Sequence, residues 1–285
     1  MREVNSVVGT AASAGHAGMI SWEQAVQTLR DDPSQRELVL ACFYDDPIQS
    51  AADRYERSSE WAALKTLLPE GAGRALDLGS GRGIVAYSLA RAGWNVTAAE
   101  PDASKVVGAG AIRELGRITG TPIHVIECAG EALDCESDSM DLVHCRAVLH
   151  HADDLGLLCR EVARVLRPGG RFIATREPVL THEEDRAVFL DSHPLHRLFG
   201  GENAYRLATY RSAIEDAGLT IDRIYNPLES DVNVFPQTLM EYKRRIARRL
   251  LLPSPRFVPD IALKLLGALS NVPGRLFTFV ASKAS

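Results

Sequence analysis

The sequence gathers acidic residues and glycines around one short segment, "LDLGSGRG" at residues 76–83. Asp77 comes just before three alternating glycines, and Glu100 ends the next apolar run, 17 residues after Gly83. Glycines at such a place let the backbone approach a ligand closely. A carboxylate before the loop would repel a pyrophosphate, whereas an acid at Glu100 suits ribose hydroxyls. These residues favour a nucleoside ligand that carries positive charge and lacks phosphates.

The same segment argues against two phosphate-binding loops. A Walker loop needs a lysine and a hydroxyl residue after its last glycine, and neither follows here. The dinucleotide fingerprint G-x-G-x-x-G, started at Gly79, needs a glycine where the chain has Ile84. A nicotinamide-dependent oxidoreductase is therefore disfavoured.

Histidines and acids that could move a proton lie further along the chain. His150 and His151 are adjacent, and a positive charge nearby would favour a neutral imidazole, which could act as a base. The alternative is that this pair only shapes its loop. Glu177 could orient a substrate hydroxyl or pair with an arginine. No metal site is predicted, because adjacent histidines give poor ligand geometry and the rest of the chain shows no ligand set with clear spacing.

Short apolar runs alternate with amphipathic segments from residue 74 onward. Five strands are predicted, at 74–79, 95–100, 122–128, 140–148 and 171–177. Helices are predicted between them, at 83–92, 103–117 and 154–166. Strands alternating with helices indicate a parallel sheet that is covered on both faces.

The remainder of the chain completes this pattern. A loop-rich stretch after Glu177 leads to a helix at 205–218, a strand at 219–226, a helical segment at about 237–270 and a final β-rich run. We expect an α/β, Rossmann-like, seven-stranded, mostly parallel sheet with an antiparallel last strand, extra N-terminal helices and a helical insertion before that strand. The predicted division is a tail and helical cap at 1–70 and one domain at 71–285, with a core at 74–177 and substrate-side elements at 178–217.

Composition sets broader limits. The 285 residues carry a net charge of -5, which gives no general reason to expect nucleic-acid binding. The N-terminus lacks the pattern of a signal peptide, no run suits a membrane span, and the five cysteines form no C-x-x-C pair, so a cytoplasmic protein with free thiols is expected. The basic stretch 243–256 could make a weak contact with an anionic membrane surface, or it could be a solvated helix face.

Five segments in order resemble the class I S-adenosylmethionine-dependent methyltransferases, and within them the type 11 small-molecule group. They are "LDLGSGRG", "AAEPDAS", "GEALDCESDSMDLV", "AVLHH" and "EVARVLRPGG", within residues 74–177. The resemblance implies S-adenosyl-L-methionine as cofactor and a small-molecule acceptor. The polar residues near the expected site and the few aromatic residues favour O-methylation of a hydroxylated, sugar-like acceptor. The alternative is a non-catalytic nucleoside-binding protein of the same fold.

The resemblance also implies roles for individual residues. The cofactor would be bound by Asp77, Gly79, Ser80, Gly81, Glu100, Pro101, Ala129, Gly130, Glu131, Cys145 and Tyr55. Ala129 stands where relatives often carry an acid that reads adenine, so Glu127, Glu131 or backbone groups would substitute. Tyr55 would close over the methionine end or pack in the core. The catalytic candidates are His151, His150 and Glu177, and the substrate candidates are His193, His196, Glu202, Asn203 and Tyr205.

Overall fold

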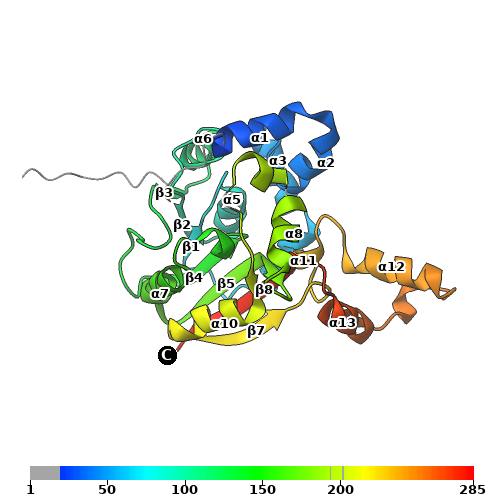
Figure 1. Ribbon diagram of the computed structural model, residues 1–285. Coiled ribbons are helices and arrows are strands. Elements are labelled where there is room, and N and C mark those ends of the chain that lie inside the picture. The colour runs from blue at the N-terminus through cyan, green and yellow to red at the C-terminus, as the bar shows by residue number, and fades with distance from the viewer. Residues whose placement is uncertain (1–19, 193, 201) are drawn as a thin grey trace, which may run out of the picture.

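The computed structural model describes residues 20–192, 194–200 and 202–285, and its centre is a mixed sheet of eight strands (Figure 1). The strand order is β3-β2-β1-β4-β5-β8-β7, and the short β6 pairs with β5. Strand β8 runs antiparallel to both of its neighbours, β5 and β7. The strands are β1 (Arg74–Leu78), β2 (Asn95–Ala99), β3 (His124–Ile126), β4 (Met140–Arg146), β5 (Leu166–Leu180), β6 (Tyr205–Arg206), β7 (Leu219–Tyr225) and β8 (Arg275–Lys283). The predicted Rossmann-like fold is confirmed, with β6 as an additional strand.

Helices cover both faces of the sheet and enclose two separate apolar cores. On one face pack α3 (Ile48–Glu56), α4 (Ser59–Lys65), α5 (Ile84–Arg91) and α6 (Ala109–Thr119). On the other face pack α7 (Leu155–Val165) and α10 (Leu207–Asp216). Because both faces are covered, the central strands read as continuous apolar runs rather than as alternating ones.

The N-terminal helices form a cap next to α6 (Figure 1). This cap contains α1 (Trp22–Asp31), the short turn η1 (Pro33–Gln35) and α2 (Arg36–Ala41). Ser21 and Gln24 form a capping box that starts α1, because each side chain satisfies a backbone amide of the other. Residues 1–19 of the predicted tail lie outside the described residues.

Two predicted boundaries are wrong for local reasons. Helix α6 begins at Ala109 rather than at 103, because Asp102 and Ser104 accept hydrogen bonds from nearby amides and hold a turn there. The stretch after Glu177 is not loop-rich: β5 continues to Leu180, and α8 (Asp185–Ser192) and α9 (Pro194–Leu198) follow. Consequently Glu177 lies inside a strand rather than at its end.

The predicted helical insertion is present between β7 and β8. It consists of α11 (Asp231–Val234), α12 (Leu239–Arg249), η3 (Pro255–Phe257) and α13 (Asp260–Leu269). Helices α12 and α13 project away from the sheet on one side of the molecule (Figure 1). Among the described residues, no helix has both the length and the apolarity that crossing a bilayer requires.

Candidate functional site

The loop after β1 contains three glycines in the left-handed region, and they serve different purposes. A Cβ on Gly79 would lie 2.7 Å from a Val148 methyl, and one on Gly83 would lie 2.9 Å from Ile112. These two glycines are therefore needed for packing. A Cβ on Gly81 would meet only one atom, 3.9 Å away, and the residue has a φ of 54°. Gly81 is thus the glycine that leaves room for a ligand.

Asp77 organises the loop from below. Its carboxylate accepts hydrogen bonds from the Ser80 hydroxyl at 2.6 Å and the Ala86 amide at 3.1 Å. Its other oxygen lies 2.9 Å from the Nδ1 atom of His144, which is fully buried. Asp77 therefore positions the loop through internal contacts, and a direct contact with a cofactor stays a prediction.

Glu100 lies at the carboxyl end of β2 and faces the glycine loop. One oxygen accepts from the Gly81 amide at 2.7 Å, and the other accepts from the Asp102 amide at 3.1 Å. Burial raises the pKa of Glu100 to about 7, although the two amide hydrogen bonds oppose that rise. Each carboxylate oxygen still has a free lone pair. Two adjacent ribose hydroxyls could donate to these oxygens and stabilise the ionised form.

The predicted adenine side shows less specific chemistry. Ala129 is exposed, and Gly130 packs so closely that a Cβ would lie 2.9 Å from Leu158. Glu127 pairs with Arg113. Glu131 accepts from the Asp153 amide at 2.9 Å. Both acids thus have protein partners, and the reading of adenine by backbone groups near Ala129 stays a prediction.

Three other predicted cofactor residues, Ser80, Pro101 and Cys145, have different surroundings. Pro101 is exposed beside Glu100, where it could cover an adenine ring. The Ser80 hydroxyl donates to Asp77. Cys145 is fully buried in β4, and this burial raises the pKa of its thiol well above the usual value. Contact between Cys145 and a cofactor stays a prediction.

The adjacent histidines have distinct environments. His150 is buried, with Nδ1 2.9 Å from Glu177 and Nε2 3.2 Å from Glu202. Burial disfavours its charged form, but the two carboxylates outweigh that effect and raise the pKa of His150 to about 9. His151 is 38 % exposed, and its Nε2 lies 3.9 Å from Glu202. His150 is therefore held in a buried hydrogen-bond network, and His151 is the more accessible of the two histidines. A catalytic role for either stays a prediction.

Glu177 supports this loop rather than pairing with an arginine. It is fully buried and accepts hydrogen bonds from the amides of Val148, Leu149 and His150. One ligand atom from each of His150, His151 and Glu202 lies within 4.8 Å of the others, a spacing that could hold a metal ion. Both ring nitrogens of His150, however, already face carboxylates. The predicted absence of a metal stays a prediction.

The predicted substrate residues are only partly brought together. Glu202 joins the histidine loop, whereas Asn203 binds Arg186 and the Ala204 amide and does not cap α10. Tyr205 packs edge-on against Tyr210. The Nδ1 atom of His196 is buried without a partner in the described part of the chain. His193 lies outside the described residues.

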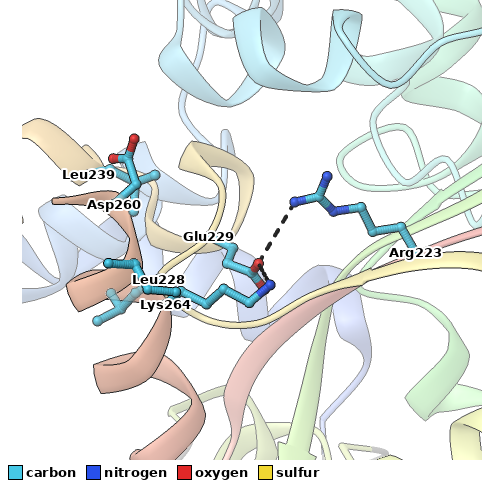
Figure 2. Close-up of a pocket in the computed structure, with 7 residues that line it drawn as sticks. Arg223, Leu228, Glu229, Leu239, Asp260 and Lys264 are labelled. Atoms are coloured by element: carbon cyan, nitrogen blue, oxygen red, sulfur yellow. Dashed lines mark ion pairs between the residues drawn. The ribbon is translucent and has the colours of Figure 1, made fainter.

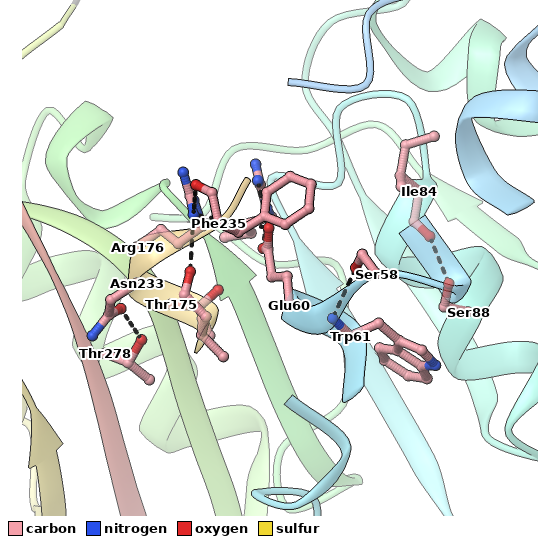
Figure 3. A network of polar contacts seen from close by, with 12 residues as sticks. Ser58, Glu60, Trp61, Ile84, Ser88, Thr175, Arg176, Asn233, Phe235 and Thr278 are labelled. Atoms are coloured by element: carbon pink, nitrogen blue, oxygen red, sulfur yellow. Dashed lines mark hydrogen bonds and ion pairs between the residues drawn. The ribbon is translucent and has the colours of Figure 1, made fainter. Parts of the chain in front are cut away.

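A buried ionic cluster is missing from the predictions: it joins Glu60 of α4, Arg146 at the end of β4 and Arg176 inside β5. Glu60, 1 % exposed, binds Arg146 through two contacts of 2.6 and 3.0 Å, and Arg176 lies 3.9 Å away. Arg176 donates to the carbonyls of Val232 and Phe235, as Figure 3 shows for Phe235. Although burial opposes ionisation, the two arginines lower the pKa of Glu60. A charged residue directly after the apolar run of β4 was the available signal.

Tyr55 connects this cluster to the core. Its ring packs against Phe43 and Trp61, with centroid distances of 5.2 and 5.9 Å. Its hydroxyl is buried and has no hydrogen-bond partner in the described part of the chain. Tyr55 therefore lies in the core, and its unpartnered hydroxyl is a polar atom that a bound molecule could satisfy. Its contact with a cofactor stays a prediction.

Comparisons with known proteins agree with this geometry. Residues 76–174 match the family model described as a methyltransferase domain. The chain is 29 % identical over 120 residues to an uncharacterized methyltransferase, YcgJ, of Bacillus subtilis, covering 38 % of this chain and 44 % of the relative. It is 30 % identical over 168 residues to a ubiquinone biosynthesis O-methyltransferase of Chelativorans sp., covering 54 % and 63 %. The chain thus spans about half the length of these relatives.

Solved structures agree on the fold. A putative sarcosine dimethylglycine methyltransferase from Galdieria sulphuraria superposes with a TM-score of 0.56 at 22 % identity, covering 84 % of this chain and 89 % of that one. The residues present also fit S-adenosylmethionine, because Gly81 leaves open space and the buried Glu100 carboxylate can accept from ribose hydroxyls. Residues 76–174 therefore form a methyltransferase domain, and the fold around it is that of the class I S-adenosylmethionine-dependent methyltransferases.

Proposed function

We propose that the protein transfers a methyl group from S-adenosylmethionine to a hydroxyl of a small polar acceptor. The observation that carries the donor half is the contact between the buried Glu100 carboxylate and the Gly81 amide. The name of the Chelativorans relative supports oxygen as the methylated atom. The polar groups Glu202 and His151 beside the loop after β4 support a hydroxylated, sugar-like acceptor.

S-adenosylmethionine, when bound, supplies an electrophilic methyl group on a sulfonium. We propose that Gly81 and Glu100 would hold this donor, and that the Nε2 atom of His151 would accept the proton that the acceptor hydroxyl loses when its oxygen takes the methyl group and S-adenosylhomocysteine leaves. Glu202, 3.9 Å from this nitrogen, stabilises the imidazolium that forms. His150 and Glu177 hold the loop, because their mutual contacts fix its backbone amides. Alignment of acceptor and methyl supplies much of the remaining rate.

The test separates proton transfer from donor binding. His151→Gln should lower methyl transfer about 100-fold or more, which is the usual contribution of a general base. Its affinity for S-adenosylhomocysteine, measured by titration calorimetry, should stay unchanged. The matched control is His182→Gln, an exposed histidine outside the site. Radiolabelled methyl transfer to a panel of sugars and phenols is the readout.

Two results would contradict the proposal. Unchanged transfer in the His151→Gln variant would remove the proposed base. Intact S-adenosylhomocysteine binding without transfer to any acceptor would favour a non-catalytic nucleoside-binding protein.

The proposed setting is the cytoplasm, with a small-molecule substrate as the main partner and with residues 243–256 making a weak contact with a membrane surface.

A further inference from the structure

The insertion between β7 and β8 exposes an unusual number of large apolar side chains. We call residues 239–272 the arm. Its turn after α12 exposes Leu250 and Leu251, and Leu251 is 91 % exposed. Ile261, Leu265 and Leu269 of α13 are also exposed and recur every four residues, so they share one helix face. Patches of this kind mark an interaction surface rather than ordinary solvated structure.

The inner side of the arm already packs against the rest of the protein through other residues. The exposed apolar side chains therefore face away from that contact. Leu263 and Gly267 form the buried side of α13, and a Cβ on Gly267 would lie 2.4 Å from the Asn226 side chain. Lys264 binds Glu229 of the body at 2.9 Å. Figure 2 shows Lys264 and Arg223 converging on Glu229 across a recess of about 420 Å³.

Further contacts hold the two helices of the arm in place. Lys243 of α12 pairs with Asp260 of α13 at 2.6 Å. Thr238 and Glu241 form a capping box at the start of α12. Although burial opposes ionisation, the Asn226 amide and Lys264 lower the pKa of Glu229, which keeps its pair with Lys264 ionised. The exposed apolar face is therefore presented on a fixed support.

Charge identifies the kind of partner. The arm carries seven cations and two acids, a net charge of +5, so the rest of the chain carries -10. Its exposed cations flank the apolar turn, at Arg244, Arg245, Arg248, Arg249 and Arg256. No carboxylate pairs with these five arginines within residues 20–192, 194–200 and 202–285. Three of them, with Glu241, line a recess of about 250 Å³ that is large enough for a phosphate group.

We propose that the arm docks on an anionic lipid bilayer. Arginines contact lipid phosphates, while Leu250, Leu251 and Phe257 enter the boundary between headgroups and acyl chains. A nucleic acid would use the arginines but would leave the apolar side chains in water. A second copy would bring another arm of charge +5 against the first. The acidic body, repelled by the lipid charge, stays on the solvent side.

This surface goes beyond the proposed methyl transfer and can be tested without an acceptor. The full chain would be sedimented with sucrose-loaded vesicles of phosphatidylcholine alone and of phosphatidylcholine with phosphatidylglycerol. Binding is expected only with the anionic vesicles and should weaken as salt rises. Arg248→Gln with Arg249→Gln should weaken vesicle binding about 30-fold, since each cation near an anionic surface strengthens binding about fivefold.

A second variant tests the apolar part. Leu250→Ser with Leu251→Ser should weaken binding by about tenfold or more while leaving the arginines in place. The matched control is Arg36→Gln with Arg57→Gln, which removes two exposed cations outside the arm and should leave vesicle binding unchanged. Unchanged S-adenosylhomocysteine affinity in all three variants would show that they are folded.

Several outcomes would overturn the proposal. They are no binding of the wild type to anionic vesicles, equal binding to neutral vesicles, or an equal loss of binding in the Arg36→Gln with Arg57→Gln control. Light scattering that finds a dimer dispersed by the serine substitutions would assign the surface to a second copy. A wild type that binds vesicles but not S-adenosylhomocysteine would instead refute the proposed methyl transfer and leave this surface standing.

Discussion

The most direct test of the donor site is the pH dependence of ligand binding to Glu100. Burial raises the pKa of this carboxyl to about 7 in the free protein. Ribose hydroxyls that donate to it bind the ionised form, so falling pH must weaken binding. With a pKa near 7, ionisation falls from about 90 % at pH 8 to about 10 % at pH 6. The affinity for S-adenosylhomocysteine should therefore fall about tenfold across this interval.

Glu100→Gln removes the titration while keeping the shape of the side chain. At pH 8 its affinity should be about 10-fold to 100-fold lower, because a hydrogen bond to a charged group contributes roughly 1.5–3 kcal/mol. Between pH 8 and pH 6 its affinity should no longer vary. Glu70→Gln is the control, since Glu70 is exposed and precedes β1 at the opposite edge of the sheet.

Titration calorimetry at pH 6, 7 and 8 measures both effects. A wild type with constant affinity over this range would refute the inference that Glu100 receives the ribose. The same conclusion would follow if Glu100→Gln kept the pH dependence of the wild type.

Three further predictions concern the loop and the buried charges. Gly81→Ala should lower the thermal midpoint only through the strain of a left-handed alanine and should lose S-adenosylhomocysteine affinity. Gly83→Ala carries the same strain and should lower the midpoint further, because its Cβ would contact Ile112; equal thermal midpoints would contradict this division. The raised pKa of His150 stabilises the fold below pH 6.5, and this stability is lost as pH rises through about 9. Urea unfolding should show a loss of up to about 3 kcal/mol between pH 6.5 and 9.5 that is absent in His150→Gln. Glu60→Gln leaves Arg146 and Arg176 without their carboxylate and should lower the free energy of unfolding by about 3–5 kcal/mol in urea denaturation. A loss below about 1 kcal/mol would show that the cluster does not stabilise the fold.

The central fold is predictable from sequence because its strands are buried on both faces. Runs such as that of β4 have no polar alternation, and their short length separates them from buried helices. The start of α6 is not predictable in this way, because the competition between a helix and the turn at Asp102 and Ser104 is decided by side-chain hydrogen bonds. The helices after β5 were missed because α8 has little apolar periodicity and buries only Phe189.

The same distinction applies to the site: contacts set by strand topology are predictable, and contacts between distant segments are not. Glu100 and Gly81 follow adjacent parallel strands, so topology alone brings them to one edge. Glu60 and Arg146 are 86 residues apart, and nothing local connects α4 to the end of β4. The different environments of His150 and His151 depend on Glu202, which reaches them from a segment 52 residues from His150. Such contacts become visible only once the chain is folded.

The side chain of Arg82 links the glycine loop to the segment between the N-terminal cap and α3. This buried guanidinium donates to the carbonyls of Phe43 and Asp45 and pairs with Asp46, all in the segment that precedes α3. The residue next to Gly81 therefore anchors the N-terminal cap. Binding energies that share one anchor are coupled, and coupling acts equally in both directions. Bound S-adenosylmethionine that orders the loop should slow proteolysis of the cap. By the same coupling, a partner that displaces the cap should lower the affinity for S-adenosylmethionine by an equal factor.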